Sequence, residues 1–304
     1  MTIRHGPTLI FSVADSFYIG GFADRITGMA ALRKIAESFR ADFKIEHSKP
    51  FDFFRVFPDR REVSNFFDTT LTTDYKIEEF NLIDDHFLKN IDSLINFLLS
   101  NHLGARLARV CINNVKPFVF DPLLNQTFLV GQEDRQYIER IERDLLYKFG
   151  QDFLRPDISQ FNENVIRLAQ ALKLQPAIGV QVRVGGQQTD WSDPLFSVPG
   201  IDQILSELTN LQHSFDAVYV STDDYELKLK LIQNVQRKWP VYALNGAAVH
   251  LERSQGNHDD LVSQSIGDHT LLRLCSAGVL VGGGGYGRTA SILAGTPCYQ
   301  ILKQ

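Results

Sequence analysis

AIGVQVRVGGQQTDW, residues 177–191, is the stretch that decides the fold of this chain. Its residues fall into two alternating sets: Ile178, Val180, Val182 and Val184 in one, and Gly179, Gln181, Arg183 and Gly185 in the other. Strict alternation with β-branched residues predicts a strand over residues 178–184. The pair Gly185-Gly186 ends this strand, because glycine favours turns.

Arg183 is the long cation of this stretch and lies near the carboxyl end of the predicted strand. In open α/β sheets, ligands bind outside the carboxyl ends of the parallel strands. A guanidinium group offers two parallel charge-assisted hydrogen bonds, which suits a phosphate. The alternative is an arginine in a surface ion pair. Arg183 is therefore our first candidate for a phosphate contact.

Downstream of this strand the sequence alternates regularly between strand and helix patterns. The patterns predict strands at 217–221, 241–244, 279–281 and 298–301, and helices at 161–172, 201–211, 225–238, 268–277 and 288–294. Repeated strand–helix units with short connections predict a parallel sheet that is covered on both faces.

The first half alternates less regularly. It is predicted to contain strands at 8–13, 42–46 and 108–112, and helices at 24–39, 87–99 and 137–149, the last of them stopped by Gly150. The two halves meet at Arg155-Pro156. We therefore expect an α/β protein of two Rossmann-like domains that face each other across a cleft, with boundaries 1–155 and 156–304.

The composition argues against several classes of protein. With 31 basic and 36 acidic residues among 304, the net charge of −5 argues against nucleic-acid binding. No run approaches the ~20 apolar residues of a membrane span, and the first apolar run is too short for a signal peptide. The three cysteines are widely spaced, and no His/Asp/Glu cluster has metal-ligand spacing. We expect a cytoplasmic, soluble protein without a metal site.

A second strand end carries polar residues. Ser221, Thr222, Asp223 and Asp224 follow the apolar run AVYV. Asp223 is placed to hold a ribose or a base edge at the carboxyl edge of the sheet. The structural alternative is that Thr222 or Asp223 caps the next helix.

A third strand end carries the run GGGGYGR, residues 282–288. Successive glycines leave backbone N–H groups bare, and the helix that follows adds its positive end, so the run predicts a diphosphate site. It lacks the downstream acidic residue of a dinucleotide fingerprint and the Lys-Ser or Lys-Thr of a P-loop. A plain tight turn is the alternative, although one glycine would suffice for it.

The loop of Gly20 and Gly21 after the first strand offers another ligand contact. Asp24 follows it in the first turn of the predicted helix, where its carboxylate can cap orphan N–H groups. The functional alternative is that this loop approaches a ligand, with Asp24 or Arg25 touching it.

Taken in order, AIGVQVRVGG…DW, AVYVSTDD and GDHTLLRLCSAGVLVGGGGYGRTA resemble the nucleotide-site motifs of the fucosyltransferase superfamily with the GT-B architecture. GGFADRI resembles its N-terminal glycine-rich loop. The resemblance covers about 20 residues near the start and most of the second half. It implies donor contacts from Gly20, Gly21, Arg183, Gly185, Asp223, Gly284, Gly285, Tyr286 and Gly287, with Asp190-Trp191 resembling the pair that follows the family's arginine.

The resemblance implies an inverting, metal-independent fucosyltransferase that uses GDP-fucose as donor and needs no cofactor. Arg183 would neutralise the leaving diphosphate. Asp24 is the first candidate for the general base, and Asp15 is the second. The acceptor, a glycan, a lipid-linked glycan or a protein, would bind mainly to the first domain.

The chain also departs from the family pattern. Gln181 stands where many members carry His, Val184 where some carry a second arginine, and glycines replace serines near the phosphates. Two alternatives therefore stay open: a GT-B glycosyltransferase or epimerase that uses a UDP-sugar, and a non-catalytic relative that binds a nucleotide or glycan.

Overall fold

The computed structural model describes residues 8–12, 21–46, 53–58, 77–81, 87–100, 107–111, 118–121, 123–124, 126–129, 135–185, 198–246 and 262–301. The chain divides into two compact units, Met1–Arg155 and Pro156–Gln304. The division coincides with the boundary placed from the sequence. The acceptor and nucleotide roles given to the two units, and the cleft between them, stay predictions.

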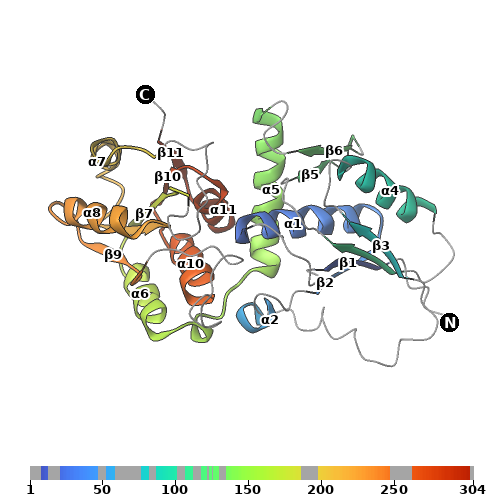
Figure 1. Ribbon diagram of the computed structural model, residues 1–304, viewed down its shortest axis with the longest axis horizontal. Coiled ribbons are helices and arrows are strands. Elements are labelled where there is room, and N and C mark those ends of the chain that lie inside the picture. Colours follow the sequence, from blue (N-terminus) through green and yellow to red (C-terminus); the bar gives the residue numbers. More distant parts are fainter. Residues whose placement is uncertain are drawn as a thin grey trace. The chain divides into compact units, whose positions relative to one another are not determined.

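The second unit is built on a five-stranded parallel sheet in the order β11-β10-β7-β8-β9 (Figure 1). The strands are β7 (Ala177–Val182), β8 (Ala217–Thr222), β9 (Val241–Ala243), β10 (Gly278–Gly282) and β11 (Cys298–Gln300). Every residue of β7, β8 and β10 is buried. The sheet is therefore covered on both faces, as the strand–helix alternation predicts.

Different helices cover the two faces of this sheet. Helices α7 (Ile201–Asn210) and α8 (Tyr225–Val235) bury Ile204, Leu208 and Leu231 in one core with Val180 and Val220. The opposite face meets α10 (Asp268–Arg273) and α11 (Gly285–Ala294), which contact β8 and β10 respectively. Gly179 of β7 allows this contact, because a Cβ there would lie 2.8 Å from Leu272 Cδ2.

Two shorter elements precede the sheet of the second unit. A 3₁₀ turn (Ile158–Gln160) leads into α6 (Glu163–Lys173). Asn162 caps α6, since its side chain accepts a hydrogen bond from the Val165 N–H at 3.1 Å. A π-helical turn, Ser263–Gly267, runs directly into α10.

The first unit holds a four-stranded parallel sheet in the order β2-β1-β4-β3. Its strands are β1 (Thr8–Ser12), β2 (Asp42–Glu46), β3 (Ile77–Asn81) and β4 (Leu107–Cys111). The helices are α1 (Phe22–Ser38), α2 (Phe53–Val56), α4 (Phe87–Ser100) and α5 (Arg135–Phe153). An antiparallel hairpin of β5 (Phe118–Asp121) and β6 (Gln126–Leu129) packs on α1 and α5.

Several sequence predictions of element bounds are wrong. Helix α5 passes through Gly150 and ends at Phe153, because Phe149 and Leu154 are buried beside this glycine and their packing outweighs its weak helix propensity. Helix α11 begins at Gly285, three residues before the predicted start. The hairpin and the π-helical turn have no counterpart among the predicted elements.

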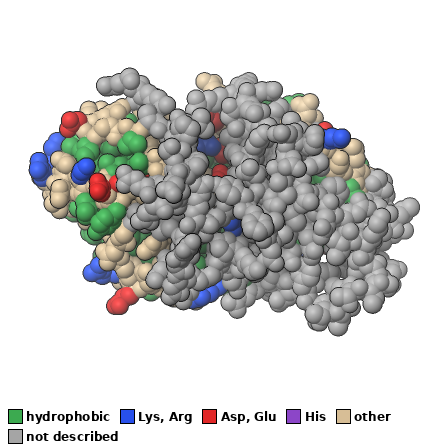
Figure 2. Space-filling model, in the orientation of Figure 1, with side chains coloured by type: hydrophobic (Ala, Val, Ile, Leu, Met, Phe, Trp, Pro, Cys, Tyr) green, Lys and Arg blue, Asp and Glu red, His purple; other side chains and the backbone are tan. Residues whose placement is uncertain are grey.

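Among the described residues, no helix is long and apolar enough to cross a membrane. The described surface in Figure 2 carries Lys and Arg side chains close to Asp and Glu side chains. This mixture of signs accords with the small net charge of −5.

Candidate functional site

The candidate site lies where the strand order of the second sheet reverses. From β7, strands β8 and β9 continue in one direction and β10 and β11 in the other (Figure 1). Such a switch point leaves a crevice at the carboxyl ends of the two central strands, and ligands of open α/β sheets bind there. Arg183 directly follows β7, and Gly283 directly follows β10. The fold thus brings two of the predicted site segments together.

The Arg183 side chain lies close beside the glycine run. A Cβ on Gly284 would lie 3.0 Å from Cδ of Arg183. Gly283 and Gly284 have φ of 108° and 78°, which L side chains rarely adopt. The backbone conformation therefore favours glycine at position 284, and a Cβ there would also crowd the arginine side chain.

The glycine run ends inside the first turn of α11. Gly284 is the N-cap, and Gly285, Tyr286 and Gly287 are the first helical residues. The first N–H groups of an α-helix have no intrahelical partner, and this end carries the positive side of the helix dipole. Since the N-cap has no side chain to fill this position, the helix start can accept an anion.

Gln181 lies beneath this helix start, on the strand face that also bears Arg183. A Cβ on Gly287 would lie 2.9 Å from Cβ of Gln181, so the helix sits directly on the strand. Gln181 is buried, and its Oε1 atom makes no hydrogen bond to the residues that the structure describes. Gln181 therefore borders the candidate anion site.

Asp223 holds the segment after β7 in place. Its Oδ1 accepts a hydrogen bond from the Val184 N–H at 2.8 Å, and its Oδ2 accepts one from the Gly185 N–H at 3.1 Å. Gly185 has a φ of 84°, which this clamp fixes. The carboxylate thus shapes the loop that carries Arg183; a contact between Asp223 and a ribose stays a prediction.

The cap of α8 differs from the sequence prediction, which named Thr222 or Asp223. Asp224 is the N-cap, and its Oδ1 accepts a hydrogen bond from the Leu227 N–H at 2.7 Å. Thr222 belongs to β8, where its hydroxyl accepts the Asp224 N–H at 3.2 Å. Thr222, Asp223 and Asp224 therefore have different structural roles.

The side chain of Tyr286 points into the unit and away from the crevice. Its hydroxyl donates its one proton to the carbonyl of Ser265, and it lies close to the Asp268 carboxyl group. The His269 ring packs edge-on against the tyrosine ring, with centroids 5.0 Å apart. At the helix start, Tyr286 can therefore offer a ligand its backbone N–H group. This geometry favours a backbone contact to a nucleotide over a side-chain contact.

Asp268 is the centre of a buried polar cluster that the sequence did not reveal. Tyr219 donates to Oδ1 at 2.6 Å, and Ser221 donates to Oδ2. Burial raises the pKa of Asp268, while the nearby charge of Lys228 opposes this rise. In the sequence, Asp268 has the pattern of an ordinary acidic residue at the start of a helix. Its partners belong to other elements, so no local sequence pattern predicts them.

His269 and Thr289 extend the cluster between α10 and α11. The Nε2 atom of His269 lies 3.1 Å from Oγ1 of Thr289, whose hydroxyl donates to the Tyr286 carbonyl at 2.9 Å. Because that hydroxyl proton is used, the histidine Nε2 carries a proton and donates to Thr289. Burial and the charge of Arg273 hold the pKa of His269 well below its usual range, so the ring is neutral.

Of the site residues predicted in the first unit, Asp24 makes a structural contact in this chain. Asp24 lies in the third position of α1, and its Oδ2 accepts a hydrogen bond from the Gly21 N–H at 3.0 Å, as the capping prediction expected. Arg25 is buried. Gly20, Asp15 and the pair Asp190-Trp191 lie outside the described residues. Catalysis by Asp24 stays a prediction.

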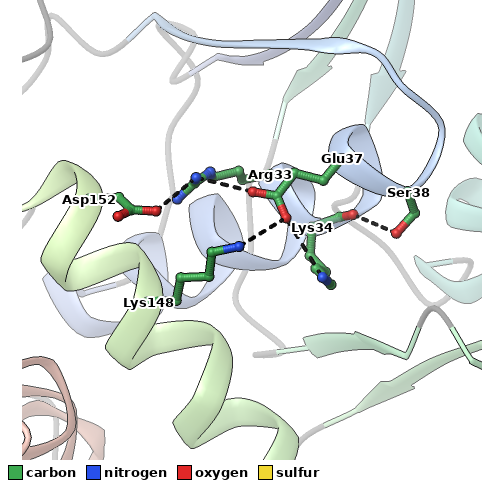
Figure 3. Close-up of polar contacts among 6 residues, drawn as sticks. All are labelled: Arg33, Lys34, Glu37, Ser38, Lys148 and Asp152. Carbon is green, nitrogen blue, oxygen red and sulfur yellow. Dashed lines mark hydrogen bonds and ion pairs between the residues drawn. The ribbon is translucent and has the colours of Figure 1, made fainter.

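A second concave region lies between α1 and α5 of the first unit, with a cavity of about 200 Å³. Figure 3 shows its charged side chains converging: Arg33 contacts Glu37 at 3.1 Å and Asp152 at 2.9 Å. Lys148 of α5 lies 3.8 Å from Glu37. These cations already face carboxylates, so the network joins the two helices rather than forming an anion site.

Among the described residues, no group of three or more His, Cys, Asp or Glu side chains is arranged to hold a metal ion. Glycosyl transfer without a metal ion stays a prediction. In such a transfer, Arg183 and the start of α11 would supply the positive charge.

The chain was compared with known proteins. No family model matches it, and no curated protein sequence does. Several solved structures are similar to it. One is a mutant of Arabidopsis thaliana FUT1 in complex with GDP, with a TM-score of 0.57 and 12% sequence identity; the match covers 99% of this chain and 72% of that chain. POFUT1 in complex with GDP-fucose gives a TM-score of 0.55 and 8% identity over 97% and 98% of the two chains. NodZ α-1,6-fucosyltransferase, soaked with GDP-fucose, has a TM-score of 0.50 and 14% sequence identity; the match covers 94% of this chain and 92% of that chain.

These similarities define the fold. The chain has the two-unit α/β architecture of the GT-B fucosyltransferases, which confirms the fold expected from the three motifs. At sequence identities of 8% to 14%, the similarity establishes the fold alone.

Proposed function

We propose that this protein is a glycosyltransferase that uses a GDP-sugar, with GDP-fucose as the first candidate donor. The observation that carries the proposal is the close approach of the Arg183 side chain to Gly284 at the switch point of the second sheet. A fixed cation and a bare helix start meet there, and both suit a diphosphate. The similar folds of proteins solved with GDP or GDP-fucose support the choice of nucleotide.

The proposed reaction is an inverting transfer. The acceptor hydroxyl attacks the anomeric carbon of the donor, the bond from that carbon to the diphosphate breaks, and a base takes the hydroxyl proton. Negative charge grows on the leaving diphosphate, so Arg183 and the N–H groups at Gly285–Gly287 stabilise the transition state more than the ground state. We propose Asp24 as the base and the first unit as the acceptor side, where the acceptor is a glycan, a lipid-linked glycan or a protein.

The test is thermal unfolding of the purified chain with GDP, UDP and GDP-fucose, each with and without EDTA. We expect GDP and GDP-fucose to raise the midpoint, UDP to have little effect, and EDTA to change neither result. Selective stabilisation by UDP would instead indicate a UDP-sugar enzyme. Hydrolysis of GDP-fucose, followed as release of fucose, then separates an enzyme from a relative that binds a nucleotide without turnover.

A further inference from the structure

We infer that Tyr286 and Asp268 form a positioning latch that holds the first turn of α11 in the orientation in which its N–H groups bind an anion. The inference rests on the proposed function for its ligand, but the latch itself is a feature of the second unit alone. Tyr286 is therefore a positioning residue, and its hydroxyl acts on the helix start without touching the donor.

The latch joins the helix start to two other elements. Tyr286 is the second residue of α11. Its hydroxyl donates to the Ser265 carbonyl in the π-helical turn and lies close to the Asp268 carboxyl group at the start of α10. Asp268 is in turn anchored to the sheet by Tyr219 and Ser221 of β8. Polar contacts through Asp268 and Tyr286 therefore connect the centre of the sheet to the helix start.

The helix start needs such a tether because its own sequence gives it little rigidity. Gly283, Gly284, Gly285 and Gly287 surround Tyr286, and glycine gives the backbone more freedom than any other residue. Tyr286 is the one residue from position 282 to 287 with a side chain that can bond to the rest of the unit. An anion site made of backbone N–H groups binds well only if those groups are already oriented.

A purely structural role for this tyrosine makes a different prediction, and Tyr242 provides the matched control. The Tyr242 hydroxyl also makes a hydrogen bond, which it accepts from Gln175 Nε2 at 2.6 Å, but Tyr242 lies in the edge strand β9 and takes no part in the latch. If the two hydroxyls only stabilise the unit, Tyr286→Phe and Tyr242→Phe should have similar effects. If Tyr286 positions the helix start, only Tyr286→Phe should change this segment and its ligand affinity.

The experiment combines two measurements on the full chain. Hydrogen–deuterium exchange of the ligand-free protein reports on the backbone of residues 282–290, and titration calorimetry measures GDP affinity. For Tyr286→Phe we expect faster exchange in this segment and a GDP affinity about three- to tenfold weaker, the usual range for one lost hydrogen bond. For Tyr242→Phe we expect wild-type exchange in this segment and wild-type affinity. Asp268→Asn, which keeps the size of the side chain, should resemble Tyr286→Phe and replaces it if that variant does not fold.

The outcomes separate the latch from the proposed function. Unchanged exchange at residues 282–290 in Tyr286→Phe, or an equal effect of Tyr242→Phe, overturns the latch. A wild-type chain that binds no GDP overturns the proposed donor, while the exchange measurement still decides whether the latch exists. Faster exchange with unchanged GDP affinity would show that Tyr286 tethers the segment but does not position an anion site, and it would overturn the inference.

Discussion

Arg183 is the side chain on which the proposed chemistry depends most. We expect Arg183→Ala to lower the rate of transfer by about 10² to 10³, the usual effect of losing one donor to a developing oxyanion. Arg183→Lys should restore only part of this rate, because lysine keeps the charge but loses the planar fork that binds two phosphate oxygens. Steady-state kinetics with GDP-fucose, together with GDP titration, measure both effects.

The control for this arginine is Arg237→Ala, which removes an exposed arginine beyond the end of α8. We expect this control to leave transfer and GDP affinity unchanged. If the Arg183→Ala protein is folded and keeps native transfer rates and native GDP affinity, the motif around Arg183 serves the fold and is not a nucleotide site.

His269 makes a prediction about pH. Its pKa is held well below the usual 6.5 by burial and by Arg273, so below about pH 6.5 the unfolded chain binds a proton that the folded chain does not. The free energy of unfolding therefore falls as the pH decreases from 6.5 toward the lowered pKa, by at most about 1.4 kcal/mol per pH unit for this one proton. Denaturant unfolding of the wild type between pH 5 and 7 measures the slope.

His269→Gln is the variant that isolates this effect. Glutamine keeps a neutral N–H donor for Thr289 and cannot take up the proton, so the slope between pH 5 and 7 should be smaller than in the wild type. The raised pKa of Asp268 acts in the opposite sense, because its contribution to stability is lost as the pH rises above 3.8. Since Asp268 is present in both proteins, the difference between them reports on His269. Equal slopes would show that another group titrates in this range.

At the scale of elements, the N-cap of α11 carries the next prediction. Gly284→Ala should weaken GDP binding, because a Cβ would lie 3.0 Å from Cδ of Arg183 and because a φ of 78° is strained for alanine. A backbone with φ of 78° and ψ of 165° lies in a region that is essentially restricted to glycine, and this strain alone costs alanine about 1–3 kcal/mol. Calorimetry with GDP and thermal unfolding separate the loss of affinity from the loss of stability.

Gly200→Ala is the matched control for this variant. Gly200 is also the N-cap of a helix, α7, but its φ is −64° and nothing lies within 4 Å of an added Cβ. Alanine at this position should leave GDP affinity unchanged. If both variants bind GDP like the wild type, the conformation of the glycine run is not what prepares the anion site.

The strands and helices of the second unit could be predicted from sequence because strong local patterns specify them. The β-branched runs of β7, β8 and β10 are buried on both faces, and each is followed by a periodic helix. The misplaced bounds have tertiary causes: α5 continues through Gly150 because its neighbours pack in the core. Hairpin β5–β6 has short strands, of four residues each, which leave too little pattern to recognise.

At the scale of the whole molecule, the site could be predicted only in part. The sequence located Arg183 and the glycine run, because each follows a recognisable strand and an unusual loop composition. It did not reveal the strand order that places β10 beside β7, although the whole site depends on that pairing. Nor did it reveal the partners of Asp223 and Tyr286, since hydrogen bonds between residues 21 to 39 positions apart leave no local signal.

The division of the chain makes the last prediction. Residues 156–304, expressed alone, should fold and bind GDP with an affinity within about threefold of the full chain. The boundary cuts no strand or helix, because α5 ends at Phe153 and the next turn begins at Ile158. A domain of about 150 residues buries enough surface to be stable alone, and this one has its own sheet covered on both faces.

The groups on which the proposed diphosphate contact depends all belong to this fragment: Arg183, the clamp of Asp223, the glycine run and the latch of Tyr286 on Asp268. Circular dichroism with a cooperative thermal transition tests folding, and calorimetry tests binding. Residues 1–155 should bind no GDP, which makes them the control. A folded fragment that binds no GDP, measured beside a full chain that does, would mean that the first unit supplies contacts that the nucleotide requires, and that the division of labour between the two units is wrong.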